Sequence, residues 1–317
     1  MQGHSIIAAI AEKRLKQESP ETFQKILEML AGLQSHFPET ESTILEAAAM
    51  PDLLNFQFGN FLMSDHFINL PIVYPKDSES EVNIPNPLES ENVVTALTRA
   101  VGIIQNSLNP KYEPTISRGL MDSLMIRYFL HLVGDSHQPL HTVAFFAKDL
   151  FDGAIINGDQ GGNLIPIIDI FHKGETNLHK IYDDAFNTFD YKNLSFPYSE
   201  ELRNKIYKQA DFLTSMYPEE YFGKKIDNLD FNQWSQEGFD IARNFVYSQV
   251  ELFPMMGPEY VITGRRSSTY EYTDHTPRPR QRVPSSSTCP RERASPSAPG
   301  GSRGHLPPEC AGAEIPG

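Results

Sequence analysis

Two histidine–aspartate pairs, each with its members four residues apart, most constrain how this chain can fold. His131 and Asp135 occur in "HLVGDSHQPLH", and His179 and Asp183 occur in "NLHKIYDD". Residues four apart lie on one face of an α-helix, one turn from each other, so both motifs predict helices. His141 follows the first pair after a proline, which turns the chain and lets a third imidazole approach the same point from another direction.

These five side chains carry the atoms that zinc binds most often, imidazole nitrogen and carboxylate oxygen. A single His–Asp pair is explained as well by a hydrogen bond, but all five together favour metal binding. A di-iron centre is the alternative in a helical bundle, although the Glu-x-x-His repeats of that class are absent from the sequence. The motifs therefore predict more than one metal site in a helical core.

Apolar spacing predicts that most of the remaining chain is helical. The predicted helices cover residues 6–15, 21–33, 41–49, 91–105, 119–135, 176–185, 199–214 and 232–252. Pro51 is expected to stop the third helix and Ser90 to cap the fourth. The best strand-like runs are "INLPIVY" and "NLIPIIDIF". The sequence thus predicts an all-α fold, a single helical domain with long functional loops at 50–90 and 137–175.

The composition divides the chain near residue 264. Residues 264–317 contain eight arginines, no lysine and nine of the 24 prolines, with no apolar periodicity. We therefore expect a domain over 1–263 and a disordered or foreign Arg/Pro/Ser-rich tail over 264–317. At the other end, "SIIAAIAEKR" reaches charged residues too soon for a signal peptide, so we expect a truncated N-terminus without a targeting segment.

The overall charge excludes one way of binding nucleic acid. The chain of 317 residues carries a net charge of −14, which argues against a basic nucleic-acid-binding face. A metal-mediated hold on phosphate remains open. No apolar run approaches the roughly 18 residues of a membrane-spanning helix, so we expect no membrane span. Both cysteines, Cys289 and Cys310, lie in the tail, so neither thiol catalysis nor a disulfide framework is expected in the body.

Three motifs in order, "HLVGDSHQPLH", "GDQGGN" and "NLHKIYD", resemble the zinc-dependent single-strand-specific nucleases of fungi, plants and protozoa, the class I or S1/P1 type. These enzymes are similar in fold to bacterial zinc phospholipase C and hold three zinc ions. Upstream, "MPDLLN", "HFINLP" and "GHSIIAAIAEKRL" resemble further metal-binding segments of the family, so the resemblance covers about residues 1–260.

The resemblance assigns each proposed ligand to one of three zinc ions. Asp52, His66 and His131 would hold the first ion. His141, His179 and Asp183 would hold the second. His4 and Asp135 would hold the third, with Asp135 joining two ions of a close pair.

The resemblance also implies the reaction. Asp52 would orient the attacking water, and Phe67, Asn69 and Asn163 would contact the substrate, although an aromatic after a ligand or an Asn in a turn is as often structural. The expected reaction is hydrolysis of single-stranded RNA or DNA to 5′-phosphorylated products, with 3′-nucleotidase activity as a further possibility. We expect a monomer that is secreted or lumenal. Another zinc phosphoesterase of this fold, such as a phospholipase C, and a catalytically impaired zinc-binding remnant are the alternatives.

Overall fold

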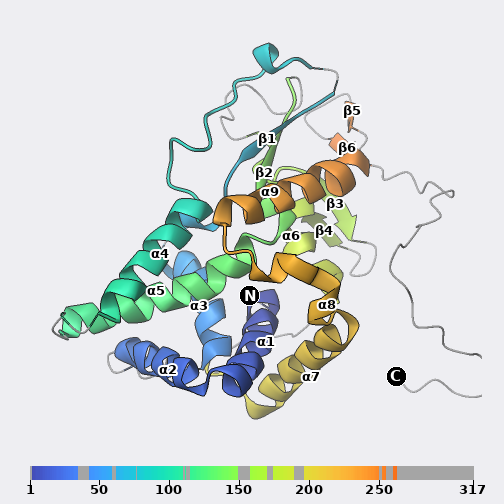
Figure 1. The fold of residues 1–317 in the computed structure, drawn as a ribbon. Helices are drawn as coiled ribbons and strands as arrows, with labels where there is room; N and C mark the ends of the chain where they lie inside the picture. The colour runs from blue at the N-terminus through green and yellow to red at the C-terminus, as the bar shows by residue number, and fades with distance from the viewer. Residues whose placement is uncertain are drawn as a thin grey trace, which may run out of the picture. The chain divides into compact units, whose positions relative to one another are not determined.

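Helices form most of the part of the chain that the structure describes (Figure 1). This computed structural model describes residues 2–34, 43–58, 62–75, 77–109, 111, 115–148, 158–169, 174–188, 196–249, 252–254 and 260–262. The α-helices among them are α1 (Gln2–Glu18), α2 (Pro20–Gln34), α3 (Ile44–Phe58), α4 (Val93–Ser107), α5 (Ile116–Asp135), α6 (Leu178–Asp183), α7 (Glu200–Met216), α8 (Glu219–Phe222) and α9 (Phe231–Ile241). The prediction of an all-α fold is confirmed.

Shorter helical segments connect these helices. They are the 3-10 segments η1 (Met63–His66), η2 (Glu79–Glu81), η3 (Pro139–His141), η4 (Ala185–Asn187), η5 (Gly223–Asp227) and η7 (Tyr247–Gln249), and the π-helical turn η6 (Ala242–Val246). The sequence predicted one continuous helix over 232–252, which was wrong, because the chain widens into η6 after α9 and then tightens into η7.

Short strands pair two by two beside the helices. β1 (Leu70–Val73) runs parallel to β2 (Val143–Phe146), with Leu70 opposite Val143. The antiparallel pairs are β3 (Pro166–Asp169) with β4 (Gly174–Asn177), and β5 (Leu252–Pro254) with β6 (Tyr260–Ile262). The two strand-like runs of the sequence contain β1 and β3. β2 lies in a region predicted as loop, and β4 covers the end of that loop and the first two residues of the helix predicted over 176–185.

The core brings the ends of two helices to one point. Ala8 of α1, Leu30 of α2, Ala48 of α3 and Ile126 of α5 are buried in a single apolar cluster. The small alanines let α1 and α3 approach α5 closely. The N-terminal turn of α1 therefore lies beside the C-terminal end of α5 (Figure 1), and α3 contacts both helices.

Pro51 does not end a helix, contrary to the prediction from the sequence. α3 continues through this residue to Phe58. A proline inside a helix removes one main-chain hydrogen bond and costs about 3 kcal/mol. Ala47, Ala48 and Ala49 in the preceding turn are almost fully buried, and we infer that their packing offsets this cost. The continued helix keeps Asp52 next to α1 and α5.

The start of α4 also differs from the expectation. Its N-cap is Asn92 rather than Ser90, and the Asn92 side chain accepts hydrogen bonds from the backbone N–H groups of Val94 and Thr95. Thr95 returns a bond to the backbone N–H of Asn92, which completes a capping box. Ser90 accepts a bond from the Asn92 side chain through its carbonyl oxygen.

The proposed tail over 264–317 lies outside the described residues, all of which belong to the unit Met1–Arg266. In the described part, none of the helices is long and apolar enough to cross a membrane.

Candidate metal centre

The last turn of α5 supplies the central pair of the site. His131 and Asp135 are 0% and 2% exposed. The His131 Nε2 atom lies 3.1 Å from Asp135 Oδ2, as the i, i+4 spacing predicts for one helix face. On the opposite side of the ring, Nδ1 lies 2.7 Å from the carbonyl oxygen of Ala48 in α3. The His131 ring is thus fixed between two helices, with Nε2 directed into the site.

Two more side chains meet this pair from other elements. His66, at the end of η1, places Nδ1 3.1 Å from His131 Nε2 and 2.9 Å from Asp135 Oδ2. Asp52 of α3 places Oδ1 3.3 Å from His131 Nε2. Asp52, His66 and His131 form one group whose donor atoms all lie within 4.8 Å of one another. These are the three residues that the resemblance assigned to the first ion.

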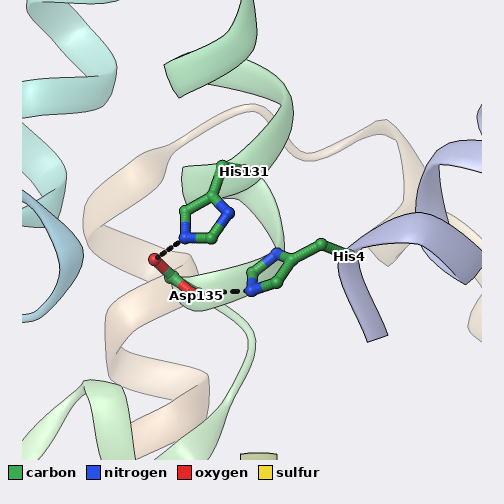
Figure 2. Close-up of side chains that lie close together, drawn as sticks. All are labelled: His4, His131 and Asp135. Carbon is green, nitrogen blue, oxygen red and sulfur yellow. Dashed lines mark ion pairs between the residues drawn. The ribbon is translucent and has the colours of Figure 1, made fainter. Parts of the chain in front are cut away.

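His4 approaches Asp135 from the first turn of α1. Its Nε2 atom lies 3.2 Å from Asp135 Oδ1, and its ring stacks on the His131 ring at a centroid distance of 3.8 Å. Figure 2 shows Asp135 paired with both imidazoles, which come from different helices. His4, His131 and Asp135 form a second group whose donor atoms likewise lie within 4.8 Å of one another. The resemblance assigned His4 and Asp135 to the third ion.

A third group lies beside the first two. His141 of η3 places Nε2 3.3 Å from Asp183 Oδ1, and His179 of α6 places Nε2 3.4 Å from Asp183 Oδ2. Their donor atoms also lie within 4.8 Å of one another. His141 Nδ1 lies 2.8 Å from the carbonyl oxygen of His66 and 3.7 Å from Asp135 Oδ1, which ties this group to the others.

The hydrogen bonds of the rings assign their tautomers. His131, His141 and His179 each place Nδ1 within 2.8 Å of a main-chain carbonyl, those of Ala48, His66 and Gly161 respectively. A carbonyl oxygen can only accept, so each Nδ1 carries the hydrogen and each neutral ring keeps its Nε2 lone pair for the site. This is the arrangement of metal-binding histidines, in which the second ring nitrogen fixes the tautomer and orientation.

The charges of the site also fit a cation. Burial lowers the pKa of His131, but the nearby carboxylates of Asp135 and Asp52 outweigh it and raise that pKa to about 10. Burial also lowers the pKa of His141, but the carboxylates of Asp135 and Asp183 outweigh burial and raise that pKa to about 9. For His4, burial and the neighbouring His131 lower the pKa to about 4. Carboxylates that hold protons on buried imidazoles so strongly would hold a metal ion in place of those protons.

Two cavities adjoin the donor groups. The larger, about 590 Å³, is lined by Asp52, Phe67, Asn69 and Asn163 among others. The smaller, about 290 Å³, is lined by His4, Ile7, Gly134, His137 and Tyr182 among others. Asp52, His141 and Asp183 line both cavities.

The three proposed substrate contacts, Phe67, Asn69 and Asn163, therefore all line the larger cavity. Asn163 is exposed, and its side-chain amide donates to the carbonyl oxygen of Gln160, 2.9 Å away. That bond is the one expected of a residue that stabilises a turn. The amide of Asn163 therefore serves the loop as well as facing the cavity.

Further residues around the donor groups were not predicted from the sequence. Gln138 donates from Nε2 to Asp183 Oδ1 at 2.8 Å and accepts from the backbone N–H of Leu140. Asp159 is fully buried and accepts a hydrogen bond from Tyr247. Gln138 and Asp159 stand inside the quoted motifs and could have been singled out there, whereas nothing around Tyr247 in the sequence marks it.

Comparison with known proteins agrees with this geometry. The sequence model of the S1/P1 nuclease family matches residues 1–271. "Endonuclease 3" of Arabidopsis thaliana is 25% identical over 161 residues, which are 50% of this chain and 48% of that relative. The match therefore spans about half the length of the curated relative. Because the family match extends over most of the sequence and includes every donor group described above, the chain belongs to the S1/P1 nuclease family.

Proposed function

We propose that this protein is a zinc-dependent endonuclease that hydrolyses single-stranded RNA or DNA to 5′-phosphorylated products. The observation that carries the proposal is that three His/Asp groups lie close together beside two cavities, and that Asp52, His141 and Asp183 line both. A phosphodiester lying across the donor groups would have room for a nucleotide on either side. The family membership supports the nuclease chemistry.

The donor set suits zinc by its chemistry. Zinc binds both imidazole nitrogen and carboxylate oxygen, and five of the eight donors are imidazoles, whereas hard cations such as magnesium prefer sites made of oxygen alone. We assign Asp52, His66 and His131 to one ion, and His141, His179 and Asp183 to a second. His4 and Asp135 would hold a third, because Asp135 turns one oxygen toward His4 and the other toward His131.

When bound, the zinc ions supply a cation to polarise the phosphoryl oxygens and to lower the pKa of water. The residues of the chain then have separate tasks. The Asp52 side chain is 36% exposed and lines both cavities, so its carboxylate can accept a hydrogen bond from the attacking water and orient it toward phosphorus. Phe67 offers a ring on which a base can stack. Asn69 and Asn163 offer amides that can bind the base, sugar or phosphate.

The net charge of −14 is compatible with this role because the binding site and the surface as a whole differ in charge. Three divalent cations outweigh the three carboxylates of the donor groups, so the loaded centre is positive. A substrate held mainly by its phosphate is read with little regard to sequence. From the resemblance to the nuclease family, we place the activity in a secreted or lumenal compartment. From the change of composition near residue 264, we assign the nuclease domain to residues 1–263.

The proposal is tested by assaying the purified full chain on single-stranded RNA, double-stranded RNA, 3′-AMP and lecithin, with zinc content measured on the same sample. We expect cleavage of the single strand into fragments with 5′-phosphate ends, and loss of both zinc and cleavage in His131→Ala. Hydrolysis of lecithin without RNA cleavage would assign the chain to a phospholipase-type reaction. Bound zinc without turnover of any substrate would identify a zinc-binding remnant.

A further inference from the structure

Asp159 is a fully buried carboxylate in the 158–163 loop that the proposed reaction does not use. It accepts hydrogen bonds from the backbone N–H of Phe145 at 2.8 Å and from the hydroxyl of Tyr247 at 2.5 Å. The backbone N–H groups of Gly161 and Gly162 also hydrogen-bond to it. A buried acid with this many donors is held in one orientation.

One peptide group connects Asp159 to the third donor group. The carbonyl oxygen of Gly161 accepts a hydrogen bond from Nδ1 of His179 at 2.8 Å. The N–H of Gly162 belongs to the same peptide group, and it hydrogen-bonds to Asp159. A trans peptide is planar, and its C=O and N–H point in opposite directions. A single rigid unit therefore lies between the carboxylate and the imidazole.

The loop that carries this peptide lies close against the segment that carries His141. Gly161 has a φ of +62°, and a Cβ atom at this residue would lie 2.2 Å from the carbonyl oxygen of Leu140. Only glycine fits this position, and the contact presses the loop against the segment that carries His141. The backbone N–H of His179 also hydrogen-bonds to the carbonyl oxygen of Gly162, at 3.4 Å.

We propose that Asp159 is a positioning residue for His179, acting through the Gly161–Gly162 peptide group, and that Tyr247 holds the carboxylate in place. A carboxylate that accepts from the N–H of a peptide polarises the group and makes its carbonyl oxygen a stronger acceptor. A stronger acceptor behind Nδ1 fixes the tautomer of the imidazole and makes Nε2 a better ligand. This inference rests on the proposed function, since it treats His179 as a zinc ligand.

The arrangement differs from the direct carboxylate–histidine contact that supports many zinc ligands. Here the carboxylate and the imidazole are separated by one peptide group, and Asp159 stays away from the donor atoms. The negative charge of Asp159 therefore acts on His179 from the Nδ1 side of the ring and adds no carboxylate to the cavity.

The test compares three variants of the full chain. Asp159→Asn keeps the size of the side chain and removes its charge. Tyr247→Phe removes only the hydroxyl that holds the carboxylate. Tyr207→Phe is the matched control, because it removes a tyrosine hydroxyl that donates to another carboxylate, Glu12, at 3.0 Å between α7 and α1. Each variant is loaded with zinc, and the release of zinc to a coloured chelator is followed in time.

We expect Asp159→Asn to release one zinc ion per chain about tenfold faster than the unmodified protein, the lower end of the effect of losing a hydrogen-bonded partner of a ligand. The other ions should leave at the unmodified rates. Tyr247→Phe should show the same selective effect in weaker form, and Tyr207→Phe should show none. Variants that melt at a lower temperature but release every ion at the unmodified rate would overturn the proposal and leave Asp159 a structural residue.

A second readout does not need the metal. Nitrogen-15 NMR of labelled histidines reports the tautomer of His179, whose signal is assigned by its loss in His179→Gln. In the metal-free unmodified protein we expect the Nδ1–H form, and in metal-free Asp159→Asn a mixture of both forms. An unchanged tautomer would overturn the inference. If the unmodified chain binds no zinc, the proposed function fails and the tautomer still decides the role of Asp159.

Discussion

At the scale of single residues, Gly134 shows how closely the ligands are packed. It lies between His131 and Asp135 on α5, and a Cβ atom there would lie 2.6 Å from Nδ1 of His4. Real Cβ atoms do not approach that closely, so any side chain at this position would displace the His4 ring. The glycine therefore allows α1 to bring His4 to Asp135.

Gly134→Ala should separate metal binding from stability. In a helix, alanine is favoured over glycine by about 1 kcal/mol, so the metal-free protein should not lose stability from the backbone. The displaced His4 should cost the chain one zinc ion, measured as zinc per chain after dialysis. Gly102→Ala in α4 is the control, since nothing lies within 4 Å of a Cβ there and zinc content should be unchanged. Full zinc content in Gly134→Ala would show that His4 does not bind the metal in this position.

The buried acid of the 158–163 loop predicts a pH effect on stability. Burial raises the pKa of Asp159 to about 6 despite the hydrogen bond from Tyr247, from an ordinary value of 3.8. The folded state then binds this proton more tightly than the unfolded state, so the contribution of Asp159 to stability is largest below pH 3.8 and falls as the pH rises through 6. Tyr247 stays neutral across this range because burial raises its pKa well above 10.

We therefore expect the free energy of unfolding of the metal-free unmodified protein to fall, relative to that of metal-free Asp159→Asn, as the pH rises from about 4 to about 7. Each unit of pKa shift corresponds to about 1.4 kcal/mol. Urea unfolding at a series of pH values, with chelator present, measures this difference. A difference that does not change with pH would mean that Asp159 ionises in the folded protein as it does in the unfolded chain.

At the scale of elements, the cap of α4 offers a direct comparison of two candidate residues. Asn92 is 3% exposed and accepts from two backbone N–H groups, whereas Ser90 contributes a carbonyl oxygen to the Asn92 side chain. Replacing a capping Asn by Ala costs about 0.5–2 kcal/mol. Asn92→Ala should therefore lower the free energy of unfolding by that amount, and Ser90→Ala should leave it nearly unchanged. The reverse order in urea unfolding would support the cap that the sequence favoured.

The helices were predictable from the sequence where the controlling interactions are local. The spacing of His131 and Asp135 fixes their common face, and Ser199 caps α7 where the sequence placed a helix start. Pro51 misled the prediction, because burial of the neighbouring alanines is a tertiary effect. Burial is also why β2 was missed. Its four residues are all buried, so they lack the alternation of apolar and polar residues that predicts a strand.

In the candidate site, too, the residues set by local sequence were predictable and those brought together by folding were not. The i, i+4 pairs and the resemblance name the donor residues in advance, because motifs are local in sequence. The support of His179 could not be predicted, because Tyr247 and Asp159 are 88 residues apart and meet only after folding. The roles of the donors and of Phe67, Asn69 and Asn163 stay predictions.

At the scale of the whole molecule, the acidic surface and the metal centre act in opposite directions on nucleic acid. With a net charge of −14, the chain without metal should repel a polynucleotide. We expect a fluorescent single-stranded oligonucleotide with non-hydrolysable linkages to bind the zinc-loaded protein and to lose that binding when a chelator removes the metal. Fluorescence anisotropy measures both states. Equal binding in the two states would place the nucleic-acid contacts away from the donor groups.

The central claim is that the three donor groups hold the zinc on which RNA cleavage depends. The most direct measurement is a titration of metal-free protein with zinc, in which bound zinc and the rate of single-stranded RNA cleavage are recorded on the same samples. The account predicts no cleavage without zinc, a rise in rate as the chain fills to three ions, and no rise in His131→Ala. Cleavage by the metal-free chain at the rate of the loaded chain would contradict it.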